Sequence, residues 1–125
     1  MDITDEVRDW VRDSGIHRGL LTLHIQHTSA SLMIQENADP QVLDDMEGFL
    51  RRLVPPGTPQ FRHVSEGPDD MPAHVRSALT TTTLSIPVVG GRPTLGTWQA
   101  LYLYEHRDQG HHRRVTAHLL GESAE

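Results

Sequence analysis

The chain has 125 residues, a formal net charge of −6 with neutral histidines, and no cysteine. The length predicts one domain over residues 1–125 with a single hydrophobic core, and the negative charge argues against nucleic acid as a partner. Without cysteine there is no disulfide, thiolate nucleophile or sulfur ligand, so any bound metal must use nitrogen and oxygen donors.

No apolar run approaches the roughly 20 residues that span a bilayer, and the N-terminal segment is acidic rather than a basic signal sequence. We therefore expect a cytoplasmic protein without a membrane partner. Nine histidines are an unusual number for this length, and imidazole is a common metal ligand. His111 and His112 lie in a charged turn, which we interpret as a solvated loop.

The first half of the chain predicts two helices and two strands. Thr4 caps a helix that ends near Gly15, and residues 19–27 then alternate as a strand that ends at His27. After a short polar step, a second strand continues the extended segment through residue 34. Asp39 and Pro40 then start a second helix, whose apolar residues recur at helical spacing up to residue 53.

The second half begins with a loop over residues 55–69 that is rich in proline, glycine and acidic residues. A helix begins near Asp70, with His74 in its first two turns. Three strands follow, at residues 80–89, 97–106 and 113–120. Glycines 90 and 91 suit a hairpin after the first of these strands, and the short turn between the last two predicts an antiparallel hairpin. The pattern predicts an α+β fold with an antiparallel-rich, β-sandwich-like core and packed helices.

Two candidate sites lie around the second strand. His27-Thr28-Ser29 can place a base or metal ligand beside a hydroxyl, because alternate strand residues share a face. The alternative is that these hydroxyls satisfy backbone groups at a kink. Glu36 and Asn37 lie beside the start of the second helix, where anionic ligands bind. The alternative there is simple capping by Asp39.

A third candidate combines His63, Asp69, Asp70 and His74, which a folded loop can bring together. Two imidazoles and a carboxylate are suitable donors for Zn²⁺, Mn²⁺ or Fe²⁺. The alternative is a solvated loop.

The fourth candidate is Gly96-Thr97-Trp98-Gln99, in which Trp98 can stack on a heteroaromatic ring and Gln99 can form paired hydrogen bonds. The alternative is that Trp98 belongs to the core. Glu105-His106-Arg107 is a charged trio at the far end of the strand predicted at residues 97–106, and a surface ion pair explains it equally well.

Four strings occur in a fixed order along the chain: HTSASLMIQENAD, VSEGPDDMPAH, IPVVGGRPTLGTWQ and YEHR. In this order the sequence resembles the YjbQ-like family over nearly its whole length. The assigned activity of that family is a secondary thiamine-phosphate synthase. The resemblance implies an α+β fold with a β-sandwich-like core, a homotrimer, and a site near subunit contacts where histidines gather.

The resemblance also implies a divalent metal, either Mg²⁺ or a Zn²⁺/Mn²⁺-type ion, with His27, His63 and His74 as its ligands. The other positions that match the family are polar, and they are Thr28, Ser29, Glu36, Asn37, Asp70, Gln99 and Glu105. Among these we expect Glu36 and Asp70, together with His27, to take part in catalysis, and the others to bind substrate.

Three functions follow as hypotheses. The first is a transferase that joins a pyrimidine pyrophosphate to a thiazole phosphate, as the resemblance implies. The second is a metal-dependent hydrolase of a small molecule, with Glu36 or Asp70 as the base. The third is a non-catalytic trimer in which the histidines bind an anion or a metal that holds the subunits together.

Overall fold

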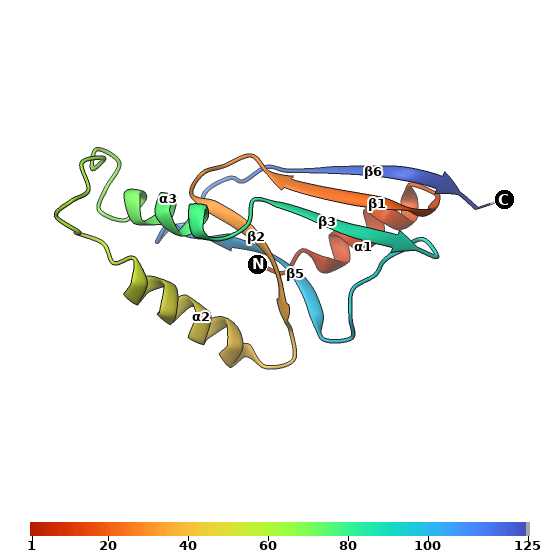
Figure 1. Ribbon diagram of the computed structural model, residues 1–125, viewed down its shortest axis with the longest axis horizontal. Helices are drawn as coiled ribbons and strands as arrows, with labels where there is room; N and C mark the ends of the chain where they lie inside the picture. Colours follow the sequence, from red (N-terminus) through yellow and green to blue (C-terminus); the bar gives the residue numbers. More distant parts are fainter. Residues whose placement is uncertain (125) are drawn as a thin grey trace.

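The computed structural model describes residues 1–124 and contains three helices and two antiparallel sheets, which confirms the expected α+β class (Figure 1). The elements in chain order are α1 (Thr4–Asp13), β1 (Ile16–Ile25), β2 (Ala30–Glu36), α2 (Pro40–Leu53), α3 (Asp70–Leu79), β3 (Thr83–Val89), β4 (Arg92–Pro93), β5 (Gln99–Glu105) and β6 (Val115–Ser123).

The core lies between the larger sheet, the smaller sheet and α1. The larger sheet has the strand order β4-β3-β1-β6, and the smaller sheet pairs β2 with β5. Leu21, Leu23 and Ile25 of β1 point inward and are buried, whereas the alternating Thr22 and His24 lie on the outer face. Helix α1 and the smaller sheet cover the inner face side by side (Figure 1).

The predicted hairpin between the last two strands is wrong. β5 pairs with β2, whereas β6 pairs with β1 in the other sheet, so the connection between them crosses from one sheet to the other. The β1–β6 pairing needs glycine at a close approach, because a Cβ on Gly121 would lie 2.1 Å from the Arg18 carbonyl oxygen. Ala117 and Leu119 of β6 pack against the core.

The expected continuation of β1 into β2 is also corrected, because the two strands belong to different sheets. The chain turns between Gln26 and Ser29, so His27 lies two residues beyond β1 rather than inside the strand. The Leu32 N–H of β2 donates to the Thr81 carbonyl, which joins the two sheets at this corner. The turn places backbone carbonyls, rather than a continuous strand, next to α3.

An acidic side chain lies at or just before the start of each of the three helices. The Asp39 carboxylate accepts from the Gln41 N–H at 2.9 Å and Pro40 is the first helical residue, as predicted for α2. Thr4 is not the cap of α1 but its first residue, and the Asp2 carboxylate accepts from its N–H and hydroxyl. Similarly, α3 begins at Asp70 and places it in a buried position.

Helix α2 packs less closely than the other elements. Of its residues only Leu50 is buried, while Phe49 is 59% and Leu53 is 56% exposed. Trp98 is 62% exposed in this chain, so its assignment to the core is wrong. Among the described residues, no helix is long and apolar enough to cross a membrane.

Candidate functional site

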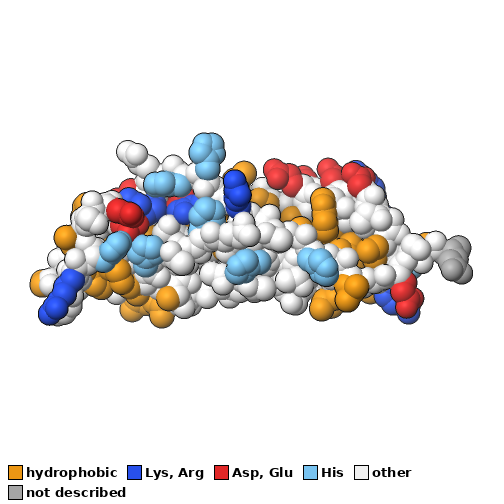
Figure 2. Space-filling view, turned by 90° about the horizontal axis from the view of Figure 1, so that it is seen from above, with side chains coloured by type: hydrophobic (Ala, Val, Ile, Leu, Met, Phe, Trp, Pro, Cys, Tyr) orange, Lys and Arg blue, Asp and Glu red, His pale blue; other side chains and the backbone are white. Residues whose placement is uncertain are grey.

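A polar cavity of about 730 Å³ lies where the turn after β1, the start of α3 and the segment between β5 and β6 meet. Its lining includes His27, His63, Asp70, His74, Arg107 and Arg113. Histidine, arginine and acidic side chains gather on one part of the face seen in Figure 2. A site that combines these groups can bind a cation and an anion at the same time.

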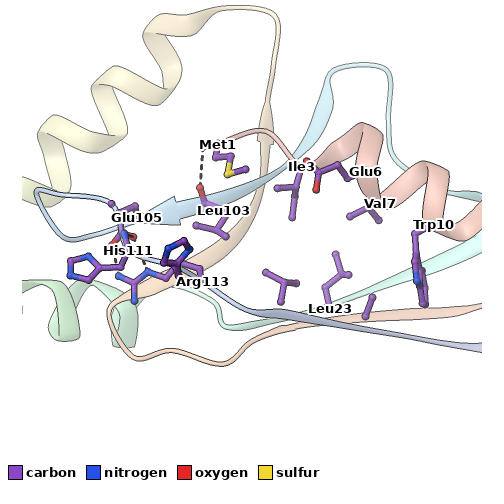
Figure 3. A pocket seen from close by; sticks show the side chains of 14 residues that line it. Met1, Ile3, Glu6, Val7, Trp10, Leu23, Leu103, Glu105, His111 and Arg113 are labelled. Carbon is purple, nitrogen blue, oxygen red and sulfur yellow. Dashed lines mark hydrogen bonds and ion pairs between the residues drawn. The ribbon is translucent and has the colours of Figure 1, made fainter.

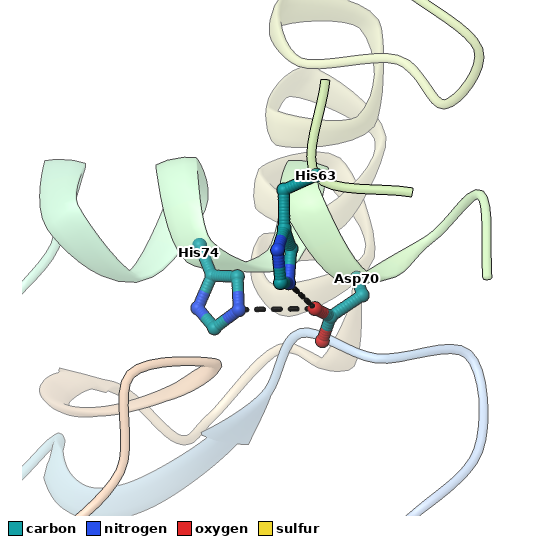
Figure 4. Close-up of side chains that lie close together, drawn as sticks. All are labelled: His63, Asp70 and His74. Atoms are coloured by element: carbon teal, nitrogen blue, oxygen red, sulfur yellow. Dashed lines mark hydrogen bonds and ion pairs between the residues drawn. The ribbon is translucent and has the colours of Figure 1, made fainter. Parts of the chain in front are cut away.

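Asp70 is the centre of the metal-ligand candidates. Its Oδ2 lies 2.8 Å from His63 Nε2 and 3.0 Å from His74 Nε2 (Figure 4). One donor atom from each of the three residues lies within 4.8 Å of the others. Asp70 is the first residue of α3 and His74 lies one turn later, so the helix places both on one face, while the preceding loop brings in His63.

The ring of His74 is held in a defined orientation. Its Nδ1 lies 2.8 Å from the Thr28 carbonyl oxygen, which can only accept, so Nδ1 carries a proton. In the neutral ring, Nε2 then holds a lone pair and faces the Asp70 carboxylate, which is also an acceptor. Such a contact is favourable only with a proton on Nε2 or with a cation shared by the two atoms. A backbone carbonyl behind an imidazole is the usual support of a metal-ligating histidine.

The other oxygen of Asp70 accepts from Arg107 NH1 at 2.9 Å. Arg107 also donates from Nε to Asp69 Oδ2 at 2.9 Å, and its side chain is only 15% exposed. These hydrogen bonds lower the pKa of Asp69 to about 2. Burial alone would raise the pKa of Asp70, but hydrogen bonds and charges from His63, His74 and Arg107 lower it. Both carboxylates are therefore ionised at neutral pH.

The opposite wall of the cavity contains an ion pair between Arg113 and Glu105. Arg113 Nε donates to Glu105 Oε2 at 2.7 Å, and its NH2 donates to the Ser29 carbonyl at 3.2 Å. Burial would raise the pKa of Glu105, but Arg113 and backbone N–H groups lower it. This pair also closes one end of an apolar groove of about 590 Å³ beneath α1, where His111 borders both cavities (Figure 3).

His27 lies in the cavity but belongs to a different hydrogen-bond network. Its Nε2 accepts from the Arg114 N–H at 2.7 Å, and its Nδ1 lies 3.4 Å from Arg113 NH1. Burial and the charge of Arg113 lower the pKa of His27. His27 does not belong to the compact group formed by His63, Asp70 and His74, and its role as a metal ligand stays a prediction.

The structure divides the polar residues singled out from the sequence between two places. His27, Thr28, Ser29, His63, Asp70 and His74 line the cavity, and Glu105 lies behind Arg113. Glu36, Asn37 and Gln99 do not line it. The strand register pairs Ala30 with Glu105 and Glu36 with Gln99, so the two groups lie at opposite ends of β2, roughly 20 Å apart.

Gln99 closes a turn, since its Oε1 accepts from the Gly96 N–H at 2.7 Å.

Arg113 and the Thr28 carbonyl are parts of the site that were not predicted from the sequence. Every residue has a backbone carbonyl, so the sequence does not show which one takes part in a site. Arg113 could have been suspected as a partner of Glu105, because the two oppositely charged residues flank the short segment between β5 and β6. Arg107 lies in the site rather than in a surface ion pair.

The sequence model described as "UPF0047 protein YjbQ-like" matches residues 1–122. A UPF0047 protein of Synechocystis is 51% identical over 121 residues, which cover 97% of this chain and 82% of that protein. The YjbQ protein of Escherichia coli O157:H7 is 47% identical, with 96% of this chain and 87% of that protein covered.

A conserved hypothetical protein of Thermus thermophilus has a solved structure that matches with a TM-score of 0.85 and 38% identity, over 96% of this chain and 90% of that one. A YugU orthologue of Clostridium acetobutylicum matches with the same TM-score at 31% identity, over 96% of this chain and 89% of that one. Sequence and fold thus agree over nearly the whole length. The chain belongs to the YjbQ-like UPF0047 family.

Proposed function

We propose that this protein is a metal-dependent enzyme in which His63, Asp70 and His74 hold a divalent cation, and that it hydrolyses a small polar molecule bound in the adjoining cavity. The observation that carries the proposal is the orientation of His74. Its Nδ1–H is fixed on the Thr28 carbonyl, so in the neutral ring the Nε2 lone pair points toward the Asp70 carboxylate, an arrangement that a shared cation makes favourable.

The donor set favours a particular class of cation. Two imidazole nitrogens and one carboxylate oxygen suit Zn²⁺, Mn²⁺ or Fe²⁺, whereas Mg²⁺ prefers oxygen ligands and keeps several waters. Three protein ligands also leave room for a substrate, as catalytic rather than structural sites do. When bound, a divalent cation supplies Lewis acidity.

The surrounding residues have separate tasks. Asp70 and His74 orient each other. Both ring nitrogens of His27 face donors, because Nε2 accepts from the Arg114 N–H and Nδ1 lies 3.4 Å from Arg113 NH1. We therefore assign His27 to holding this wall of the cavity in place. His111 Nδ1 lies 2.8 Å from the Gln109 carbonyl, so the neutral ring keeps an unprotonated Nε2. We assign His111, which borders the cavity, as the proton acceptor.

The charges favour hydrolysis over transfer between two phosphorylated substrates. Arg107 is paired with Asp69 and Asp70, and Arg113 is paired with Glu105, so each cavity guanidinium already has a carboxylate partner. Recognition of a pyrophosphate and a second phosphate normally requires additional positive charge. The thiamine-phosphate synthase reaction that the family resemblance implies remains the alternative, and it rests on that resemblance.

The test combines metal binding with activity. Chelator-treated protein is titrated with Zn²⁺ and Mn²⁺, alongside His63→Ala and His74→Ala and a control, His118→Ala, that removes an exposed histidine of β6 outside the cavity. We expect one tight site in the native protein and the control, and its loss in the other two variants. Equal binding by all four proteins would refute the metal centre.

The same samples are assayed on a panel of esters, phosphoesters and amides, and for thiamine-phosphate formation with Mg²⁺. Hydrolysis that requires the tight metal supports the proposal. Thiamine-phosphate formation by the native protein that persists in His63→Ala and His74→Ala would support transfer instead.

We also propose a homotrimer. Phe49 and Leu53 near the end of α2 are exposed apolar side chains, as is Trp98 before β5, and associating proteins cover side chains of this kind. Light scattering after size-exclusion chromatography should give three times the 14.0 kDa chain mass. A trimer that persists in chelator separates assembly from the cation, whereas dissociation would favour the non-catalytic role in which a metal holds the subunits together.

A further inference from the structure

Behind the proposed cation site, on which this inference rests, lies a second set of residues that hold the ligands in place. We infer that Arg107 is a positioning residue: it holds one oxygen of Asp70 so that the other faces His63 and His74, while Asp69 neutralises its charge. Arg107 NH1 donates to Asp70 Oδ1 at 2.9 Å, whereas Asp70 Oδ2 faces both imidazoles. Asp70 is 2% exposed, so its carboxylate has these partners in place of water.

Arg107 has three different anchors. Its Nε donates to Asp69 Oδ2, its NH1 to Asp70 Oδ1, and its NH2 to the Glu66 carbonyl, each at 2.9 Å. The Asp108 N–H adds a hydrogen bond to Asp69 Oδ2 at 3.0 Å. The planar guanidinium therefore ties the end of β5 to the loop before α3. A lysine ammonium has no fixed fork of donors and cannot hold the three acceptors in one geometry.

A lone positive charge next to a cation site would weaken cation binding. Asp69 removes this cost, because its carboxylate forms an ion pair with Arg107 at 2.9 Å, and both side chains are largely shielded from solvent. The pair is neutral as a unit, so the effect of Arg107 on the cation is mainly to orient Asp70. Consecutive aspartates thus have separate tasks, since Asp70 faces the cation and Asp69 faces the arginine.

A matched control lies next to this network. Arg51 forms an ion pair with Asp108 at 3.0 Å, but both side chains are substantially exposed and Arg51 does not contact Asp70. Arg51→Lys therefore makes the same chemical change in a neighbouring ion pair, which is linked to this network through the Asp108 backbone N–H. It should leave the cation site intact.

The experiment measures Zn²⁺ affinity of the full chain by competition with a chromophoric chelator, counting only the site that His63→Ala removes. We expect Arg107→Lys, which keeps the charge, to bind Zn²⁺ about 10- to 100-fold more weakly, the range for residues that orient metal ligands. Arg51→Lys should bind as the native protein does. Asp69→Asn, which keeps the Arg107–Asp70 contact, should also bind more weakly, because the arginine charge is then unbalanced.

Circular dichroism and thermal unfolding verify that each variant is folded, and Arg107→Gln, which also lacks the guanidinium fork, decides the question if Arg107→Lys does not fold. Native-like Zn²⁺ affinity in the folded Arg107 variant would overturn the positioning role, and native-like affinity in Asp69→Asn would overturn the charge balance, while either result leaves the cation site standing. Absence of any Zn²⁺ site in the native protein would instead remove the proposed function on which the inference rests.

Discussion

Replacing Asp69 by Asn should destabilise the protein in a pH-dependent way. The pKa of Asp69 falls from an ordinary 3.8 to about 2 in the folded protein, chiefly because Arg107 donates to it. A folded pKa below the unfolded one means that the folded state binds fewer protons, so the stabilisation is complete above about pH 4. It corresponds to about 2 kcal/mol at pH 7, falls to about 1.3 kcal/mol at pH 3, and disappears below pH 2.

Urea unfolding of metal-free protein at pH 7, 5, 4 and 3 measures this difference between native protein and Asp69→Asn. Asp45→Asn, at an exposed position of α2, serves as the control and should show little difference at any of these pH values. The reasoning would be refuted by a difference in the free energy of unfolding between native protein and Asp69→Asn that stays constant from pH 7 to pH 3. Equal free energies of unfolding at pH 7 would also refute it.

Gly121→Ala should cost about 1–3 kcal/mol of stability, because its Cβ would lie 2.1 Å from the Arg18 carbonyl oxygen. Gly110→Ala, which meets no atom within 4 Å, should cost much less in the same urea titration, and equal costs would contradict the β1–β6 pairing. Burial and the charge of Arg76 lower the pKa of His106 to about 4, so its ring should stay neutral at pH 5 in an NMR titration. Because unfolded histidine binds a proton near pH 6.5, His106 should destabilise the fold by up to about 3 kcal/mol as the pH falls to 4, and a ring that titrates near 6.5 would contradict this burial.

Local signals in the sequence predicted the elements well. Asp39-Pro40 identified the start of α2, and the paired glycines after β3 identified its hairpin, where both have positive φ. Strand partners were harder, because alternation shows which face of a strand is apolar but not which strand lies beside it. The short connection between β5 and β6 therefore suggested a hairpin where the chain in fact changes sheets.

The candidate site shows the same limit. The i,i+4 spacing of Asp70 and His74 on a helix was visible in the sequence, and the loop with His63 was recognised as a candidate. The Thr28 carbonyl was not, since only the turn between the two sheets brings it to His74. Glu36 was grouped with the histidines through family resemblance, yet β2 separates them along its length.

The most direct test of the account is the position of a bound cation. Crystals of the protein grown with Zn²⁺ or Mn²⁺ should show an anomalous scattering peak about 2.0–2.2 Å from His63 Nε2, His74 Nε2 and an Asp70 oxygen. A peak among these three atoms would establish the metal centre. No peak there at saturating metal, or a peak held by other residues alone, would contradict it.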